Sequence, residues 1–171
     1  MGSGKTSIAN MLAEKTGMPF IEMDDLIVQI SERESVNDIF EQDGEIRFRE
    51  LEIKTAKIVA QKHNTIISTG GGVVMNKIII DYLKQNGTVI FLDASFEIIE
   101  QRLAGDTTRP LFKNKDQAKK LYDFRRSLYE HYADITIQTD NKTLEKITEA
   151  ILPLIRGLKH MTKTKMPVQV S

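Results

Sequence analysis

Apolar positions along the chain alternate between helical spacing and short β-branched runs. Segments in which apolar residues recur every three or four positions predict helices, and these are 7–15, 26–30, 36–40, 44–62, 77–85, 95–103, 117–132 and 144–155. Short runs rich in β-branched and aromatic residues predict strands, and these are 19–21, 65–68, 88–92 and 135–138. Ser35 is expected to cap the helix at 36–40. Gly157 is expected to end the last helix, and residues 159–171, which lack a clear period, are expected to form a loose tail.

Strands that alternate with helices predict an α/β fold with a mainly parallel sheet and helices on both faces. Sheets of this kind bind ligands at the carboxyl ends of their strands. A length of 171 residues fits one compact domain. We therefore expect chemically important residues just after the strands and in the loops at that edge.

Composition excludes several classes of protein. The 24 basic and 24 acidic residues balance, so neither a general nucleic-acid binder nor a membrane-surface protein is indicated. Cysteine is absent, which excludes disulfides and thiolate metal sites. Apolar runs are too short to span a bilayer and no signal segment opens the chain. These features predict a soluble, cytoplasmic protein.

The first residues match the end of a phosphate-binding loop. Gly4-Lys5-Thr6 corresponds to the last three positions of the G-x-x-x-x-G-K-[ST] pattern. In that pattern, backbone amides surround phosphate oxygens, the lysine reaches the β- and γ-phosphates, and the hydroxyl holds Mg²⁺. The first glycine and the strand before it would precede Met1, so we expect a truncated N-terminus. A flexible Gly/Ser terminus followed by a helix is the alternative.

Charged residues follow the next strand and occupy the long helix. Glu22, Asp24 and Asp25 come directly after the run at 19–21, where carboxylates can hold Mg²⁺ through water or deprotonate a hydroxyl. Helix capping is the alternative for these residues. Arg49 and Glu52 share a helix face, so Arg49 could bind a substrate carboxylate while Glu52 holds it in place. A surface ion pair is the alternative there.

A run of glycines and three further arginines are also candidate site residues. Gly70-Gly71-Gly72 follows the strand at 65–68, and three glycines favour close approach of a ligand over an ordinary turn. Arg109 lies in a polar loop at 104–116 that could close over a nucleotide, with Arg102 just before it. Arg125 lies in the helix at 117–132. An exposed basic loop and a solvated basic face are the respective alternatives.

Taken in this order, the motifs resemble those of the shikimate kinases, within the nucleoside-monophosphate-kinase-like group of P-loop proteins. The most specific segments are Gly44–Glu52, Gly70–Gly72, Arg109–Leu111, and Arg125–Tyr129 with Ala133. The resemblance implies a three-layer P-loop kinase fold with a five-stranded parallel sheet, whose first, central strand is missing here. It implies one domain over 1–158, a substrate-binding region near 25–62 and a lid near 104–116.

The resemblance also implies an activity and its residues. ATP would transfer its γ-phosphoryl group to the 3-hydroxyl of shikimate, with Mg²⁺, on a monomer in the pathway to aromatic amino acids. The residues implied for ATP are Gly2, Ser3, Gly4, Lys5, Thr6, Ser7, Arg102 and Arg109. Those implied for shikimate are Asp24, Arg49, Gly70, Gly71, Gly72 and Arg125. The catalytic residues would be Lys5, Asp24 and Arg109, and the metal residues Thr6 and, through water, Glu22.

Two other functions fit parts of the pattern. Another small-molecule kinase of the group, such as a gluconate kinase, would keep the phosphate loop and the lid without needing Arg49, Gly71-Gly72 and Arg125 together. A nucleotide-binding or regulatory module without catalysis would fit the incomplete phosphate loop. One departure from the family pattern is Glu22, which stands where the family usually has aspartate.

Overall fold

A computed structural model describes residues 2–103, 115–161 and 168–170. Its helices are α1 (Lys5–Thr16), α2 (Met23–Ser31), α3 (Val36–Gln42), α4 (Gly44–Val59), α5 (Lys77–Asn86), α6 (Phe96–Leu103), α7 (Lys115–Tyr132) and α8 (Leu144–Met161), with a 3-10 helix η1 (Val73–Met75). Its strands are β1 (Phe20–Glu22), β2 (Ile66–Ser68), β3 (Thr88–Asp93), β4 (Ile135–Gln138) and β5 (Val168–Val170). The predicted order of helices and strands is confirmed up to β4.

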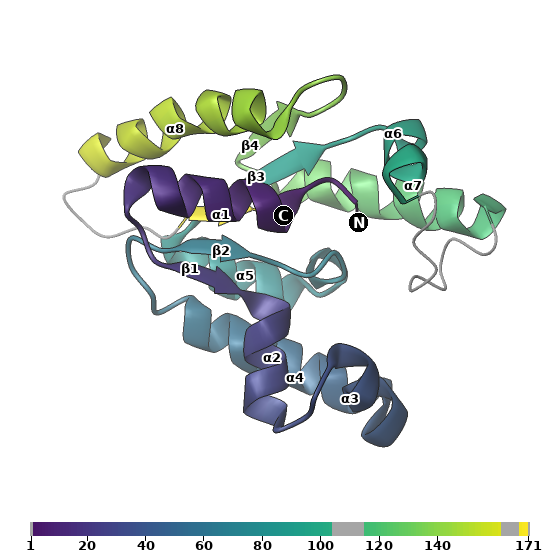
Figure 1. Ribbon diagram of the computed structural model, residues 1–171. Coiled ribbons are helices and arrows are strands. Elements are labelled where there is room, and N and C mark those ends of the chain that lie inside the picture. Colours follow the sequence, from purple (N-terminus) through teal and green to yellow (C-terminus); the bar gives the residue numbers. More distant parts are fainter. Residues whose placement is uncertain (1, 104–114, 162–167, 171) are drawn as a thin grey trace.

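The strands form one parallel sheet in the order β1-β2-β5-β3-β4. Neighbouring residues of β2 face opposite sides of this sheet. Ile66 packs with α1 and α8, whereas Ile67 packs with α2, α4 and α5. The sheet therefore lies between two helical layers, which Figure 1 shows as α1 and α8 on one side and α4 and α5 on the other.

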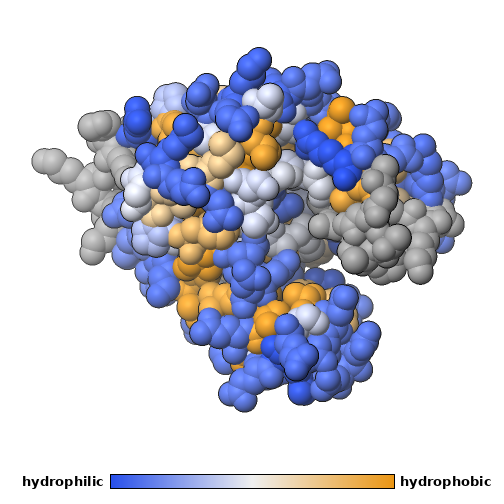
Figure 2. All heavy atoms as spheres, in the orientation of Figure 1, coloured by the Kyte–Doolittle hydropathy of each residue, from blue (hydrophilic) through white to orange (hydrophobic). Residues whose placement is uncertain are grey.

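Helices α2, α3 and α4 also form a lobe of their own, which projects from the body in Figure 1. Its small core is made of Ile27, Ile39, Phe48 and Leu51. Ser35 caps α3 as predicted, because its side chain accepts a hydrogen bond from the Asp38 amide at 3.1 Å. Figure 2 shows the molecular surface hollowed between this lobe and the body.

The C-terminal segment differs from the loose tail that the sequence predicts. Helix α8 continues past Gly157 to Met161, because a glycine lowers helix stability without by itself ending a helix. Val168–Val170 then forms β5 and pairs with both β2 and β3. A missing central strand would leave its two neighbours without a ladder partner, whereas β2 and β3 each have one in β5. Three residues are too few to show a period, so this strand had no sequence signal.

Among the described residues, no helix combines the length and the apolar character that crossing a membrane requires.

Candidate active site

The phosphate loop leads directly into α1. Gly2 and Gly4 both adopt positive φ angles, 66° and 85°, which glycine reaches without strain. Gly4 is the N-cap of α1 and supplies no side chain to the first helical amides. Those amides, together with the positive end of the helix dipole, make this helix start suited to an anion.

A cleft opens in front of the loop at the carboxyl edge of the sheet. It gathers residues from the loop, from the end of β1, from the turn after β2 and from the end of α6. The residues that line it are Gly2, Gly4, Lys5, Thr6, Ser7, Glu22, Asp24, Asp25, Thr69, Gly70, Gly71, Arg102 and Leu103. Eleven of the residues singled out from the sequence thus lie around one cleft, as the strand-edge rule for parallel sheets predicts.

Thr6 and Glu22 bring two oxygen ligands together in this cleft. The Thr6 hydroxyl donates a hydrogen bond to Glu22 Oε2 at 2.8 Å. Hydroxyl and carboxylate oxygens suit Mg²⁺, which keeps several waters and binds substrate phosphates rather than a cage made of protein alone. No group of three or more acidic, histidine or cysteine ligands occurs in the described part of the chain.

Asp24 sits against the first glycine of the triglycine turn. A Cβ atom built on Gly70 would lie only 2.8 Å from Asp24 Oδ1, so this carboxylate occupies space that any other residue would fill. Burial, followed by the carboxylates of Glu22 and Glu52, raises the pKa of Asp24 from 3.8 to about 6, although Lys5 opposes the shift. A carboxylate with that pKa can both accept and release a proton near neutral pH.

Arg49, Glu52 and Arg125 converge on the last glycine of the turn. From a Cβ built on Gly72, Arg49 Nη1 would be 3.2 Å away, Arg125 Nη2 3.9 Å and Glu52 Oε1 4.0 Å. The two arginines come from α4 and α7, which are far apart in sequence. The structure therefore brings together both guanidinium groups that the sequence nominated for a carboxylate, beside the backbone of the glycine turn.

Glu52 is the buried anchor of this cluster, with 2% of its surface exposed. Arg49 Nη1 donates to Glu52 Oε2 at 2.6 Å, and Glu45 Oε1 accepts from Arg49 Nη2 at 3.1 Å. Burial raises the pKa of Glu52, and the nearby charges of Arg49 and Arg125 oppose this rise. The alternative of a surface ion pair is therefore wrong for Arg49 and Glu52, because one partner is inside the protein.

Arg125 has a hydrogen-bond donor that no other residue described by the structure satisfies. Its Nε atom is buried and has no hydrogen-bond partner among the described residues. A buried donor without a partner costs free energy unless a ligand or water satisfies it. Arg125 therefore carries a donor that a bound acceptor or a water molecule can satisfy, on the same side chain whose Nη2 lies near Gly72.

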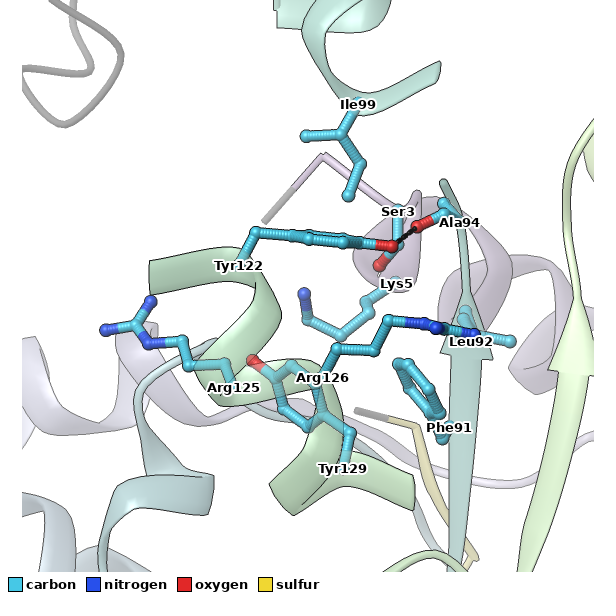
Figure 3. A pocket seen from close by; sticks show the side chains of 10 residues that line it. All are labelled: Ser3, Lys5, Phe91, Leu92, Ala94, Ile99, Tyr122, Arg125, Arg126 and Tyr129. Carbon is cyan, nitrogen blue, oxygen red and sulfur yellow. Dashed lines mark hydrogen bonds between the residues drawn. The ribbon is translucent and has the colours of Figure 1, made fainter. Parts of the chain in front are cut away.

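Helix α7 is held in place by two contacts that the sequence analysis did not anticipate. The Tyr129 hydroxyl donates to the Gly71 carbonyl, and Arg126 makes a two-point ion pair with Asp93, at 3.1 and 2.8 Å. Figure 3 shows Arg126 directed towards β3 and its neighbour Arg125 directed away from it. Neither contact has a local sequence signal, because each joins α7 to a segment that is remote along the chain.

Three of the residues nominated from the sequence remain, namely Arg102, Ser3 and Arg109. Arg102 Nη1 donates to the Gly2 carbonyl at 3.3 Å, which places it at the loop. Ser3 is buried and faces a second, mainly apolar pocket drawn in Figure 3. That pocket is lined by Ser3, Lys5, Phe91, Leu92, Ala94, Ile99, Tyr122, Arg125, Arg126 and Tyr129. Arg109 and most of the predicted lid at 104–116 lie outside the described residues.

Comparison with known proteins agrees with this geometry. The shikimate kinase family model matches residues 1–156. This chain belongs to the shikimate kinase family. It is 40% identical to a shikimate kinase from a Sulfurihydrogenibium strain over 91% of this chain and 93% of the relative. The family resemblance stated from the motifs is thereby confirmed, and with it the interpretation of the chain as an ATP-dependent kinase.

Solved shikimate kinases share the fold. The enzyme from Acinetobacter baumannii, determined in complex with shikimate, superposes with a TM-score of 0.82 at 32% identity, covering 93% of this chain and 90% of that one. The enzyme from Aquifex aeolicus gives a TM-score of 0.81 at 33% identity, covering 93% and 94%. The predicted α/β P-loop kinase fold is confirmed at this level. Strand β5 lies beyond the segment that the family model matches.

Proposed function

We propose that this chain transfers the γ-phosphoryl group of ATP to the 3-hydroxyl of shikimate, giving shikimate 3-phosphate and ADP. The hydroxyl oxygen forms the new bond to phosphorus while the bond from phosphorus to the bridging oxygen of ADP breaks. The hydroxyl proton passes to a base, and ADP leaves with the bonding electrons. Membership of the shikimate kinase family supports the reaction, and the cleft supplies the groups for it.

The carboxylate of shikimate would bind between Arg49 and Arg125. Both guanidinium groups lie beside Gly72, and the unpaired Nε of Arg125 supplies a donor for the incoming oxygen. Glu52 holds Arg49 in a fixed orientation and balances part of the positive charge. Two fixed arginines orient a small anion strongly, because a carboxylate accepts two parallel hydrogen bonds from a guanidinium group.

Asp24 would orient the reacting hydroxyl and accept its proton. Its carboxylate lies against Gly70 and lines the same cleft as Lys5 and Thr6. A pKa of about 6 leaves it ionised at neutral pH, so it can act as a base there. Substrate bound between the arginines and Asp24 would face the phosphate loop across the glycine turn.

The phosphates of ATP would bind the loop and the start of α1. The amides after Gly4 and the Lys5 ammonium would neutralise charge on the transferred group. Arg102 lies at the loop, and Arg109 would join from the lid. Mg²⁺, held by Thr6 and through water by Glu22, would neutralise further charge on the β- and γ-phosphates.

The proposed function also assigns parts of the chain to the catalytic domain, the shikimate site and the lid. Residues 1–158 would form one catalytic domain acting as a monomer, with α2–α4 carrying the shikimate site and 104–116 the lid. In the phosphate-loop motif a strand precedes the loop. We infer that β5 takes the sheet position between β2 and β3 that such a strand would occupy.

One observation carries the proposal: Arg49 and Arg125, from distant helices, meet at the Gly72 backbone within the same site as Asp24. Among kinases of this group, such a pair of cations beside a base suits a hydroxylated carboxylic acid. Gluconate is also a hydroxylated carboxylic acid, so the match to the shikimate kinase family is what decides between the two substrates.

Release of ADP by the purified chain tests the function. With ATP and Mg²⁺, we expect turnover with shikimate and none above background with gluconate or nucleoside monophosphates. Turnover with gluconate but not with shikimate would overturn the proposal. Running the same assay on a chain extended by about ten apolar residues and a Gly-x pair before Met1 shows whether a strand before the loop is needed for activity.

A further inference from the structure

The triglycine segment forms a β-turn whose central peptide can take either of two orientations. The Val73 amide donates to the Gly70 carbonyl at 3.3 Å, which closes the turn around Gly71 and Gly72. Gly72 has φ −91° and ψ −16°, the values of the third residue in a type I turn. A glycine at that position equally favours type II, in which the peptide between Gly71 and Gly72 is rotated by about half a turn.

Local sequence therefore does not choose between the two orientations. Gly72 does not use the positive φ that glycine allows. Its lack of a side chain instead makes room for Arg49, whose Nη1 would lie 3.2 Å from a Cβ at this position. Gly70 likewise makes room for Asp24. A contact from elsewhere in the fold must hold the peptide between Gly71 and Gly72, since neither glycine does so.

That contact is the hydroxyl of Tyr129, which donates to the Gly71 carbonyl from α7. The Tyr129 ring stacks on Phe91 of β3 with centroids 5.0 Å apart, so the hydroxyl is directed by a ring fixed at its base. Burial raises the pKa of Tyr129 despite the opposing charge of Arg125, so the hydroxyl keeps its proton and remains a donor.

We propose that Tyr129 is a positioning residue that holds the Gly71–Gly72 peptide in the type I orientation and so shapes the shikimate side of the site. Because a trans peptide points its carbonyl and its amide in opposite directions, fixing the Gly71 carbonyl also fixes the Gly72 amide. The turn lies between Asp24 at Gly70 and the two arginines at Gly72. A rotated peptide would place the wrong group against the bound ring, whereas the phosphate loop would be unaffected.

The inference rests on the proposed function and makes a prediction of its own. Tyr129→Phe keeps the ring and its stacking on Phe91 and removes only the donor. We expect the KM for shikimate to rise about 3- to 10-fold, the range that one lost hydrogen bond produces. The KM for ATP and kcat should stay within about twofold of the original chain.

Tyr122→Phe is the matched control. It removes the same atom from the same helix, where the Tyr122 hydroxyl donates to the Ala94 carbonyl at 2.8 Å, away from the glycine turn. Thermal melting of both variants reports the loss of stability, and calorimetric titration with shikimate reports binding without catalysis. A merely structural role for Tyr129 would make the two variants alike.

An unchanged shikimate KM in Tyr129→Phe, or equal rises in the KM values for shikimate and ATP, would overturn the inference while leaving the function intact. A shikimate-selective loss in Tyr129→Phe that is absent from Tyr122→Phe supports it. If the original chain neither binds nor phosphorylates shikimate, the proposed function fails first, and that result is seen before any variant is made.

Discussion

At the scale of single residues, the site places charges where water cannot reach them fully and offsets the cost with specific partners. Asp24 lies among other carboxylates and relies on Lys5 as its nearby cation. Glu52 is buried but paired with Arg49. Burial of such groups costs stability, so their arrangement is better explained by substrate binding than by the needs of the fold.

Arg49→Lys should weaken shikimate binding far more than ATP binding. Lysine keeps the positive charge but cannot make a two-point contact with a carboxylate. We expect the KM for shikimate to rise about 10- to 100-fold, the loss typical of hydrogen bonds to charged groups, with the KM for ATP nearly unchanged. Steady-state kinetics with each substrate varied in turn measures both values.

Arg47→Lys is the control for this change. Arg47 lies on the same helix, two positions away, and pairs at the surface with Glu50, its side chain 54% exposed. It should behave like the original chain. Equal losses for shikimate and ATP in Arg49→Lys would contradict the assignment of Arg49 to the substrate carboxylate.

The pKa of Asp24 predicts a pH dependence of catalysis. Its base form is lost as the pH falls through about 6, rather than through the ordinary value of 3.8. The kcat/KM for shikimate should therefore decline about tenfold for each pH unit below that point. A profile measured from pH 4.5 to 8 that stays flat down to pH 5 would rule out Asp24 as the base.

The raised pKa of Asp24 also predicts that Asp24→Asn stabilises the chain at neutral pH while abolishing turnover. Between pH 4 and 6 the unfolded chain loses its Asp24 proton before the folded chain does, so stability falls as pH rises across this window. Above it, the neutral amide should add at most about 3 kcal/mol to the free energy of unfolding. Urea unfolding at pH 7.5 and at pH 4 measures this gain, which should fade at the lower pH.

At the scale of elements, β5 is the least expected part of the molecule. Three residues from the C-terminal segment occupy the centre of the sheet and pair on both sides, with Val168 opposite Ile66 and Thr88, and Val170 opposite Ser68 and Ile90. Central strands of parallel sheets satisfy buried backbone groups on two neighbours at once. The carboxyl end of β5 also points to the edge where the phosphate loop lies.

Gln169→Pro should therefore destabilise the fold. Proline lacks the amide hydrogen and cannot donate to the ladder of a central strand. We expect a loss of about 1–3 kcal/mol, the cost of a buried carbonyl left without its donor, measured by thermal melting. Gln169→Ala keeps the amide and serves as the reference. A proline variant that melts with the alanine variant would show that the segment does not pair with β2 and β3 in solution.

At the scale of the whole molecule, the two proposed binding regions lie on different parts of one body. The phosphate loop and α1 belong to the layer that packs with α8, while Arg49 belongs to the lobe of α2–α4. They meet at the cleft along the sheet edge, where Asp24 and the glycine turn lie between them. This division suits two substrates that bind at the same time and react where they touch.

Shikimate and ADP should therefore stabilise the chain additively. At free concentrations about one hundred times its Kd, each ligand should add roughly 2.7 kcal/mol to the free energy of unfolding. Thermal melting with each ligand alone and with both together tests this expectation. Mutual exclusion, seen as no further stabilisation by the second ligand, would contradict two separate regions.

Local patterns in the sequence determined much of this protein. Helical periods, β-branched runs and the Ser35 cap predicted the helices and strands up to β4, because these signals depend on neighbouring residues. The nominated residues Lys5, Asp24 and Gly70 line one cleft, because parallel strands end at one edge. Arg49 and Arg125, which lie on helices, meet at Gly72 in the turn that follows Gly70. The family followed from the order of the motifs.

Tertiary structure alone decided the rest. The strand at 168–170 forms because β2 and β3 offer two open ladders, and the residues of these strands are about 80 to 100 positions away. The raised pKa of Asp24 requires burial and the approach of Glu52 from another helix. The contact of Tyr129 with Gly71 requires α7 to lie across the turn. Each depends on distances between segments that are remote along the chain, and local patterns contain no such distances.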